Sequence, residues 1–106
     1  MIQTDPRLLL KQAGVKERMA AFDLPALQDD FYKISKEFIS NLNGDDRLQM
    51  ESLLNSIILS RKSKISKLAE AVNEDPTIQT KLTPEEKELF NSIASATILF
   101  KESVMS

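Results

Sequence analysis

The sequence of 106 residues contains no cysteine and no histidine. Without cysteine the chain can form no disulfide, no thiolate nucleophile and no cysteine-ligated zinc site. Without histidine it lacks the side chain that most often serves as a general base near neutral pH and as a metal ligand. Both absences argue against an enzyme, so we expect no catalytic residue, no metal site and no cofactor.

Turn-forming residues are also scarce, since the sequence has only two glycines and four prolines. This scarcity favours a few long helices over many short strands. Hydrophobic residues make up 42% and charged residues 28% of the chain. That balance is close to the globular average and is not the composition of a disordered chain. The length suits one domain that buries its own core.

No apolar run approaches the roughly 18 residues that a membrane-spanning helix needs. The N-terminus has no signal-peptide pattern, so we expect an intracellular protein without a membrane partner. The net charge of −2 argues against attraction of the whole protein to nucleic acid. The acid pairs Asp29–Asp30 and Glu85–Glu86 could in principle bind Mg²⁺. Neighbours on a helix point about 100° apart, however, so we interpret these pairs as solvated surface.

Four helices are predicted, and the first begins at "TDPR". Asp5 is its N-cap and Pro6 its first helical residue, while Gly14 should weaken or break it in the middle. Phe22 falls in the connection that follows. The second helix, residues 26–42, should end before Gly44 at positive φ. Its apolar stripe comprises Leu27, Phe31, Ile34, Phe38 and Leu42.

The third predicted helix, residues 46–72, is the longest. Its apolar seam comprises Met50, Leu54, Ile57, Arg61, Ile65, Leu68 and Val72, with a second row of Leu53, Ile58 and Ala69. An apolar surface this wide indicates burial on more than one side, in a bundle or against a partner. Residues 73–81 should form a turn-rich loop in which Pro76 stops any helix.

The fourth predicted helix opens at "TPEE". Thr83 is the N-cap, Pro84 the first helical residue, and Glu86 completes a capping box. Its apolar stripe comprises Leu89, Ile93, Ala96 and Phe100, widened by Phe90, Ala94 and Ile98. The sequence therefore predicts an all-α fold, a bundle of about four helices around one long central helix.

The stretch "SRKSKISKLA", residues 60–69, carries four cations and no acid. Because Arg61 lies on the apolar seam, its guanidinium should be half-buried and paired with a carboxylate from another helix. Alternatively, Arg61, Lys62, Lys64 and Lys67 form a basic surface that binds phosphates. The negative net charge and the lack of aromatic residues among these cations argue against that alternative.

Three stretches together resemble the GINS family: "LPALQDDFYKISKEFISNL", "LLNSIILSRKSKISKLAEA" and "LTPEEKELFNSI". The first stretch resembles the start of a helix in the family, the second resembles the end of the family's long helix, and the third resembles the opening of the next helix. The order and spacing match over roughly residues 23–93. The resemblance is closest to archaeal GINS subunits that carry the helical domain first.

The resemblance implies a non-catalytic subunit of a DNA replication complex. In the family, four subunits of one or two kinds pack their helical domains into a homo- or hetero-tetramer. The tetramer bridges the MCM helicase and a Cdc45/RecJ-like protein at replication forks, in the cytoplasm or nucleoid, and direct DNA binding should be weak or absent. The core or interface residues expected here are Phe31, Tyr32, Ile34, Phe38, Leu54, Ile57, Arg61, Lys64, Ile65, Leu68 and Phe90.

One departure from the family concerns the end of the chain. Members of this type usually continue into a small β-rich C-terminal domain, which this sequence does not contain. We therefore expect a single helical domain over residues 1–106, either as a helical-domain piece or as a naturally short version. A small helical nucleic-acid-binding protein and a helical protein-interaction adaptor remain the alternative functions.

Overall fold

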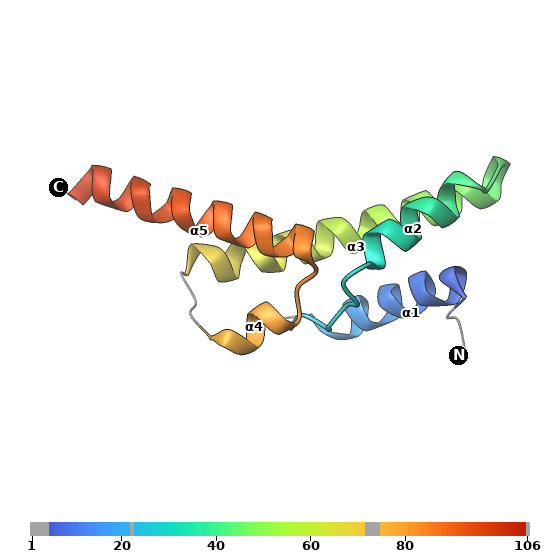
Figure 1. Cartoon of the computed structure of the whole chain (residues 1–106), viewed down its shortest axis with the longest axis horizontal. Coiled ribbons are helices and arrows are strands. Elements are labelled where there is room, and N and C mark those ends of the chain that lie inside the picture. Colours follow the sequence, from blue (N-terminus) through green and yellow to red (C-terminus); the bar gives the residue numbers. More distant parts are fainter. Residues whose placement is uncertain (1–4, 22, 72–74, 106) are drawn as a thin grey trace.

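The computed structural model describes residues 5–21, 23–71 and 75–105 and shows five α-helices there (Figure 1). These are α1 (Pro6–Met19), α2 (Phe31–Ser40), α3 (Gly44–Glu70), α4 (Pro76–Thr80) and α5 (Pro84–Met105). None of the described residues lies in a strand. The predicted all-α fold with one long central helix is therefore confirmed.

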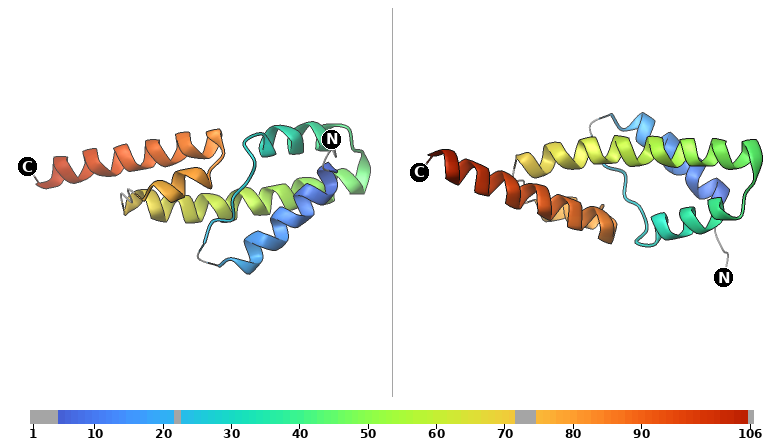
Figure 2. Two further views of the ribbon diagram at one scale, coloured as in Figure 1. Left: turned by 60° about the horizontal axis from the view of Figure 1, so that its bottom comes forward. Right: turned by 90° about the horizontal axis from the view of Figure 1, so that it is seen from above.

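The 27-residue helix α3 is the element on which the others pack. Helices α1 and α2 lie along its N-terminal part, and α5 lies along its C-terminal part and runs past its end (Figures 1 and 2). The molecule is consequently elongated, with extents of 54 × 29 × 23 Å. One apolar core lies between α1, α2 and α3, and a second lies between α3, α4 and α5.

The predicted caps are present in the structure. The Asp5 carboxylate accepts a hydrogen bond from the Arg7 N–H at 3.0 Å, which starts α1. The Thr83 N–H donates to Glu86 Oε1 at 3.0 Å, and the Glu86 N–H donates to Thr83 Oγ1 at 3.3 Å. This reciprocal pair is the predicted capping box of α5. Gly44 has the predicted positive φ, at 61°, but it is the first residue of α3 instead of the residue that terminates α2, which ends at Ser40.

The second helix begins later than predicted, at Phe31 instead of residue 26. Leu24 is buried in the second core, and the Pro25 carbonyl accepts a hydrogen bond from Arg61, so these tertiary contacts hold the segment outside a helix. The inner face of α2 is also rotated from the predicted stripe. Its buried residues are Phe31, Ser35 and Ile39, while Ile34 and Phe38 are half-buried.

Two further predictions were wrong. Gly14 does not break α1, because it is a point of close packing: a Cβ there would lie 2.8 Å from Leu53 Cδ1. Pro76 starts a helix instead of stopping one, since Asp75 caps α4 by accepting from the Thr77 N–H at 3.0 Å. Phe22, Val72 and residues 73–74 of the predicted loop lie outside the described residues.

Candidate functional site

Arg61 lies at the centre of the molecule and is fully buried. Its Nε and Nη2 donate to the Glu86 carboxylate of α5 at 2.6 and 2.9 Å, and its Nη1 donates to Glu17 Oε1 of α1 at 2.9 Å. Its remaining bonds go to the backbone carbonyls of Pro25 at 2.6 Å and Lys81 at 3.0 Å. All five N–H donors of the guanidinium are therefore used. The predicted pairing with a carboxylate from another helix is confirmed, and the burial is complete instead of partial.

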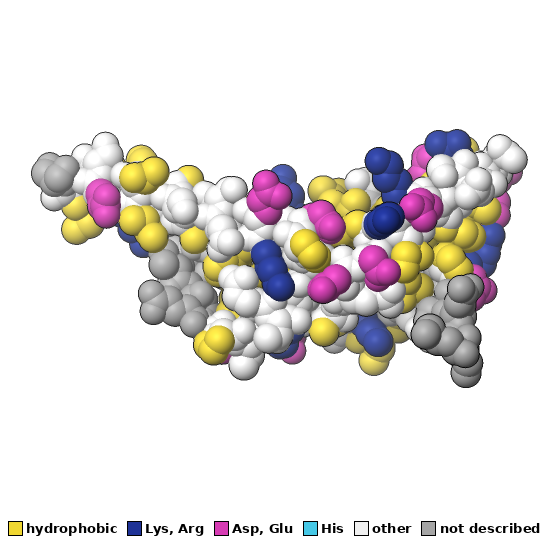
Figure 3. Space-filling view, in the orientation of Figure 1, with side chains coloured by type: hydrophobic (Ala, Val, Ile, Leu, Met, Phe, Trp, Pro, Cys, Tyr) yellow, Lys and Arg dark blue, Asp and Glu magenta, His cyan; other side chains and the backbone are white. Residues whose placement is uncertain are grey.

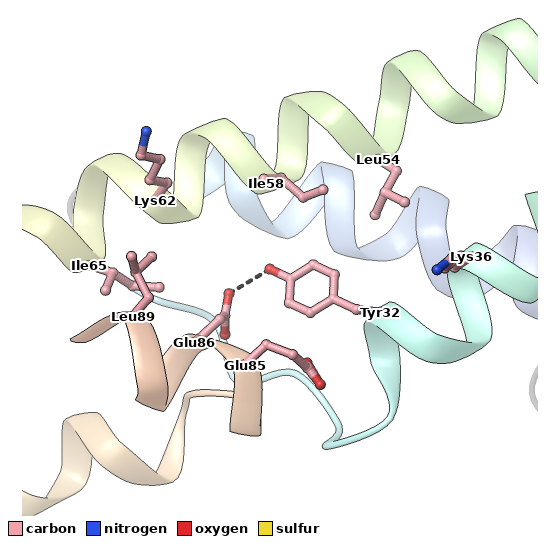
Figure 4. Close-up of a pocket in the computed structure, with 9 residues that line it drawn as sticks. All are labelled: Tyr32, Lys36, Leu54, Ile58, Lys62, Ile65, Glu85, Glu86 and Leu89. Carbon is pink, nitrogen blue, oxygen red and sulfur yellow. Dashed lines mark hydrogen bonds between the residues drawn. The ribbon is translucent and has the colours of Figure 1, made fainter. Parts of the chain in front are cut away.

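The two carboxylates have further partners. Glu17 Oε2 accepts from Lys64 Nζ at 2.8 Å and from Ser60 Oγ at 2.9 Å. Glu86 Oε2 accepts from Tyr32 Oη at 2.6 Å (Figure 4). This ion network, which we define as Glu17, Tyr32, Arg61, Lys64 and Glu86, joins α1, α2, α3 and α5. Two cations balance two anions, as a buried charged cluster requires.

The network shifts the pKa values of Glu86, Arg61 and Tyr32. Burial alone would raise the pKa of Glu86, but hydrogen bonds from Arg61, Tyr32 and the Thr83 N–H outweigh it and hold the pKa below its usual value. Burial would likewise lower the pKa of Arg61, yet its bonds to Glu86 and Glu17 raise it. Burial and the bond to Glu86 raise the pKa of Tyr32. Glu86 is thus held ionised, while Arg61 and Tyr32 are held protonated.

The network removes two cations from the candidate basic surface. Arg61 is buried, and the Lys64 side chain is only 12% exposed because it donates to Glu17 and to the Ala20 carbonyl. Only Lys62 and Lys67 of the four remain exposed. The alternative of a basic ridge of Arg61, Lys62, Lys64 and Lys67 is therefore wrong, since the C-terminal end of α1 covers that side of α3.

The structure distributes the expected core or interface residues over both cores. Phe31, Ile57, Arg61, Ile65 and Phe90 are buried within the chain, so they have no surface left for a partner. The remaining members of the set are half-buried: Tyr32, Ile34, Phe38, Leu54, Lys64 and Leu68. We had not singled out Glu17 from the sequence. Its spacing from Leu10 and Ala13 on the inner face of α1 was the signal that could have identified it.

The C-terminal end of α5 carries five of the large apolar side chains that are exposed in the described chain. Residues 98–105 are all exposed, and between Leu89 and Met105 the only charged residues are Lys101 and Glu102. We define the α5 overhang as residues 98–105. Its large apolar side chains, with their exposed fractions, are Ile98 (40%), Leu99 (65%), Phe100 (69%), Val104 (66%) and Met105 (84%).

The overhang corrects the predicted packing of the last helix. Ile98 and Phe100 belong to the stripe that the sequence assigned to a packed face, but α3 ends at Glu70 and leaves them uncovered. Ile98, Leu99 and Phe100 are consecutive, and successive side chains on a helix point about 100° apart. Apolar side chains of the overhang therefore point in several directions, with Lys101, Glu102 and Ser103 between them.

Other kinds of site find no support in the described residues. Across residues 5–21, 23–71 and 75–105, no group of three or more carboxylate side chains is placed to hold a metal ion. In the same part of the chain, no helix combines the length and apolar character that crossing a bilayer requires. The interpretation of the pair Glu85–Glu86 as solvated surface was wrong for Glu86, which is buried in the network, while Glu85 is exposed as expected.

Comparison with known proteins identifies the family. The Sld5 family model, the GINS complex protein helical bundle domain, matches residues 8–105. No curated protein and no solved structure matched the chain. The match takes in all of α2, α3, α4 and α5 and most of α1. The chain belongs to the GINS complex proteins, as its sequence motifs indicated, and is a subunit of a DNA replication complex whose partners are other GINS subunits.

Proposed function

We propose that this chain is a non-catalytic, structural subunit of a GINS complex that bridges the MCM helicase and a Cdc45/RecJ-like protein at replication forks. The family match supports the replication complex, and the α5 overhang is the observation that supports a structural role within it. Such a subunit works inside the cell, on the chromosome.

The overhang supports this role because the rest of the described chain leaves its large apolar side chains exposed. The last turns of a helix gain little from propensity alone, and most helix stability in proteins comes from packing of an apolar face. Exposed apolar patches of this kind mark interaction sites. We therefore infer that the α5 overhang is buried by another subunit of the complex.

The ion network supports a structural role in a different way. Acidic and basic side chains inside a protein can act in catalysis, but here they form ion pairs with one another. These side chains are Glu17, Arg61, Lys64 and Glu86. They join three helices from distant parts of the sequence. Among the described residues they form no group that could hold a metal ion. Their use is to fix the helices relative to one another, which a scaffold subunit requires.

A pull-down tests the proposal. The tagged full chain is captured from a native cell extract treated with nuclease, and the bound proteins are identified by mass spectrometry. The proposal predicts recovery of a second GINS-like subunit together with MCM or a Cdc45/RecJ-like protein. Recovery of GINS subunits without either partner would refute the bridging role. Recovery of unrelated proteins only would favour a general helical adaptor.

The same experiment separates the proposal from direct nucleic-acid binding. The four-cation ridge that motivated that alternative is reduced to Lys62 and Lys67, so nuclease treatment should not change the set of recovered proteins. Loss of all partners on nuclease treatment would show that nucleic acid, not protein contact, holds them to the chain.

A further inference from the structure

A groove of about 390 Å³ lies between the start of α2 and the start of α5, across the middle of α3 (Figure 4). Its walls are mainly apolar: Leu54 and Ile58 come from α3 and Leu89 comes from α5, while the buried Ile65 lies at its base. Tyr32 of α2 closes one side. Figure 3 shows apolar side chains between α5 and α2 with charged side chains around them. The α5 overhang lies outside this groove, so the two surfaces are separate.

The groove continues along α2 into a second hollow of about 340 Å³, with which it shares Lys36, Leu54 and Ile58. Seven α3 residues line the two hollows, and all except Asn55 recur at intervals of four, three, four, four and three: Arg47, Glu51, Leu54, Ile58, Lys62 and Ile65. This spacing describes one continuous stripe on a helix. At 1.5 Å per residue the stripe is about 27 Å long, which is enough to seat about five helical turns.

The ion network makes the walls of this groove rigid. The Tyr32 hydroxyl donates to Glu86, which is itself held by Arg61, so the α2 and α5 sides of the groove are tied together. Ile65 beneath them is 1% exposed and cannot move without disturbing the second core. A preformed apolar groove costs a ligand less ordering than one that must open first.

The charges around the groove do not cancel. Glu86 is paired with buried Arg61, and Glu51 is paired with Arg47 at 2.8 Å. The remaining charged side chains that line the two hollows are Lys36, Lys62 and Glu85, two cations against one anion. An apolar groove with an excess of positive charge complements an apolar helix face flanked by acids.

We propose that this groove binds an acidic amphipathic helix of another protein, laid along α3 between α2 and α5. The proposal is independent of the bridging role, because it depends on the groove alone. Leu54 and Ile58 contact the apolar face of the bound helix, and Lys36 and Lys62 face its acidic flanks.

The test uses the full chain and fluorescent synthetic helical peptides of about 18 residues, the length that spans the stripe. One peptide has leucines at helical spacing flanked by glutamates. The second has the same leucines flanked by lysines, and the third has the acidic composition in scrambled order. Fluorescence anisotropy measures binding. We expect the acidic peptide to bind at least about tenfold more tightly than either of the others at low salt.

Matched variants locate the binding. Ile58→Glu should weaken the acidic peptide at least about tenfold, because it places a charge in the apolar floor. Leu59→Glu is the control, since Leu59 is also exposed but does not line the groove. The variant Lys36→Glu/Lys62→Glu leaves the floor intact and should reverse the preference between acidic and basic peptides.

Several results would overturn the proposal. They are no binding of the acidic peptide, equal binding of all three peptides, or binding that Ile58→Glu leaves unchanged while circular dichroism shows the variant folded. Analytical sedimentation of the chain alone tests whether a second copy of the chain fills the groove instead. If the chain self-associates and Ile58→Glu abolishes that association but Leu59→Glu does not, the groove is filled by a second copy and the proposal is wrong.

Discussion

Replacing Arg61 with methionine should strongly destabilise the fold, because methionine keeps the apolar stem of the side chain but has no guanidinium and no hydrogen-bond donor. The change removes all five N–H donors from a fully buried position. It leaves the carboxylates of Glu17 and Glu86 without their shared cation and the carbonyls of Pro25 and Lys81 without their donors. A buried charge that loses its partner bears the cost of desolvation without compensation.

The size of the effect follows from that cost. Removing one partner of a buried ion pair typically costs about 3–5 kcal/mol. Both carboxylates keep other partners, Lys64 for Glu17 and Tyr32 for Glu86, so we expect a loss near the lower end, about 3 kcal/mol. A domain of this kind has a total stability of about 5–15 kcal/mol, so the variant should remain folded but marginal. Urea unfolding followed by far-ultraviolet circular dichroism measures the loss directly.

Two further variants test the reasoning. Arg47→Met breaks an exposed pair on the same helix, in which Arg47 and Glu51 side chains are 48% and 45% exposed, and should cost no more than about 0.5 kcal/mol. Adding Glu17→Gln and Glu86→Gln to Arg61→Met should recover part of the loss, since neutral amides need no counter-charge. A cost below about 1 kcal/mol for Arg61→Met, or no recovery in the triple variant, would refute this account of the network.

Other predictions concern pH, packing and capping. Because the network lowers the pKa of Glu86, stability should fall as the pH drops below the ordinary glutamate value of about 4.3, and urea midpoints in Glu86→Gln should show a smaller fall. Because the pKa of Tyr32 is raised, stability should also fall as the pH rises above about 10, a loss that Tyr32→Phe should remove. Gly14→Val should cost about 1–3 kcal/mol by forcing its side chain against Leu53, visible as a lower urea midpoint. Thr83→Ala should cost about 1 kcal/mol by removing the N-cap of α5, measured in the same assay.

Local signals in the sequence predicted the features that depend on local chemistry. Asp5 and Thr83 cap helices because their side chains reach backbone N–H groups two or three residues away. Gly44 adopts positive φ because it has no side chain to oppose it. Arg61 on an apolar seam predicted a pair with a carboxylate from another helix, since a cation in that position needs one, but the prediction was a half-buried side chain and the structure buries it completely.

Features that depend on tertiary contacts could not be predicted in the same way. The segment before α2 stays non-helical because Leu24 packs in the second core and the Pro25 carbonyl accepts from Arg61. Both contacts are with residues distant in sequence. Gly14 was interpreted as a helix breaker because the sequence does not show that Leu53 lies against it. Phe100 is exposed because α3 ends before it can cover that part of α5. The apolar periodicity of α5 does not show where a neighbouring helix ends.

The claim that another GINS subunit buries the α5 overhang is tested most directly by measuring the mass of the native complex. Native mass spectrometry of the tagged complex would compare the wild type with Leu99→Glu and with Leu48→Glu, whose side chains are 65% and 63% exposed. The account predicts that Leu99→Glu loses the other GINS subunits and that Leu48→Glu, outside the overhang, retains them. Retention of every subunit by Leu99→Glu would contradict it.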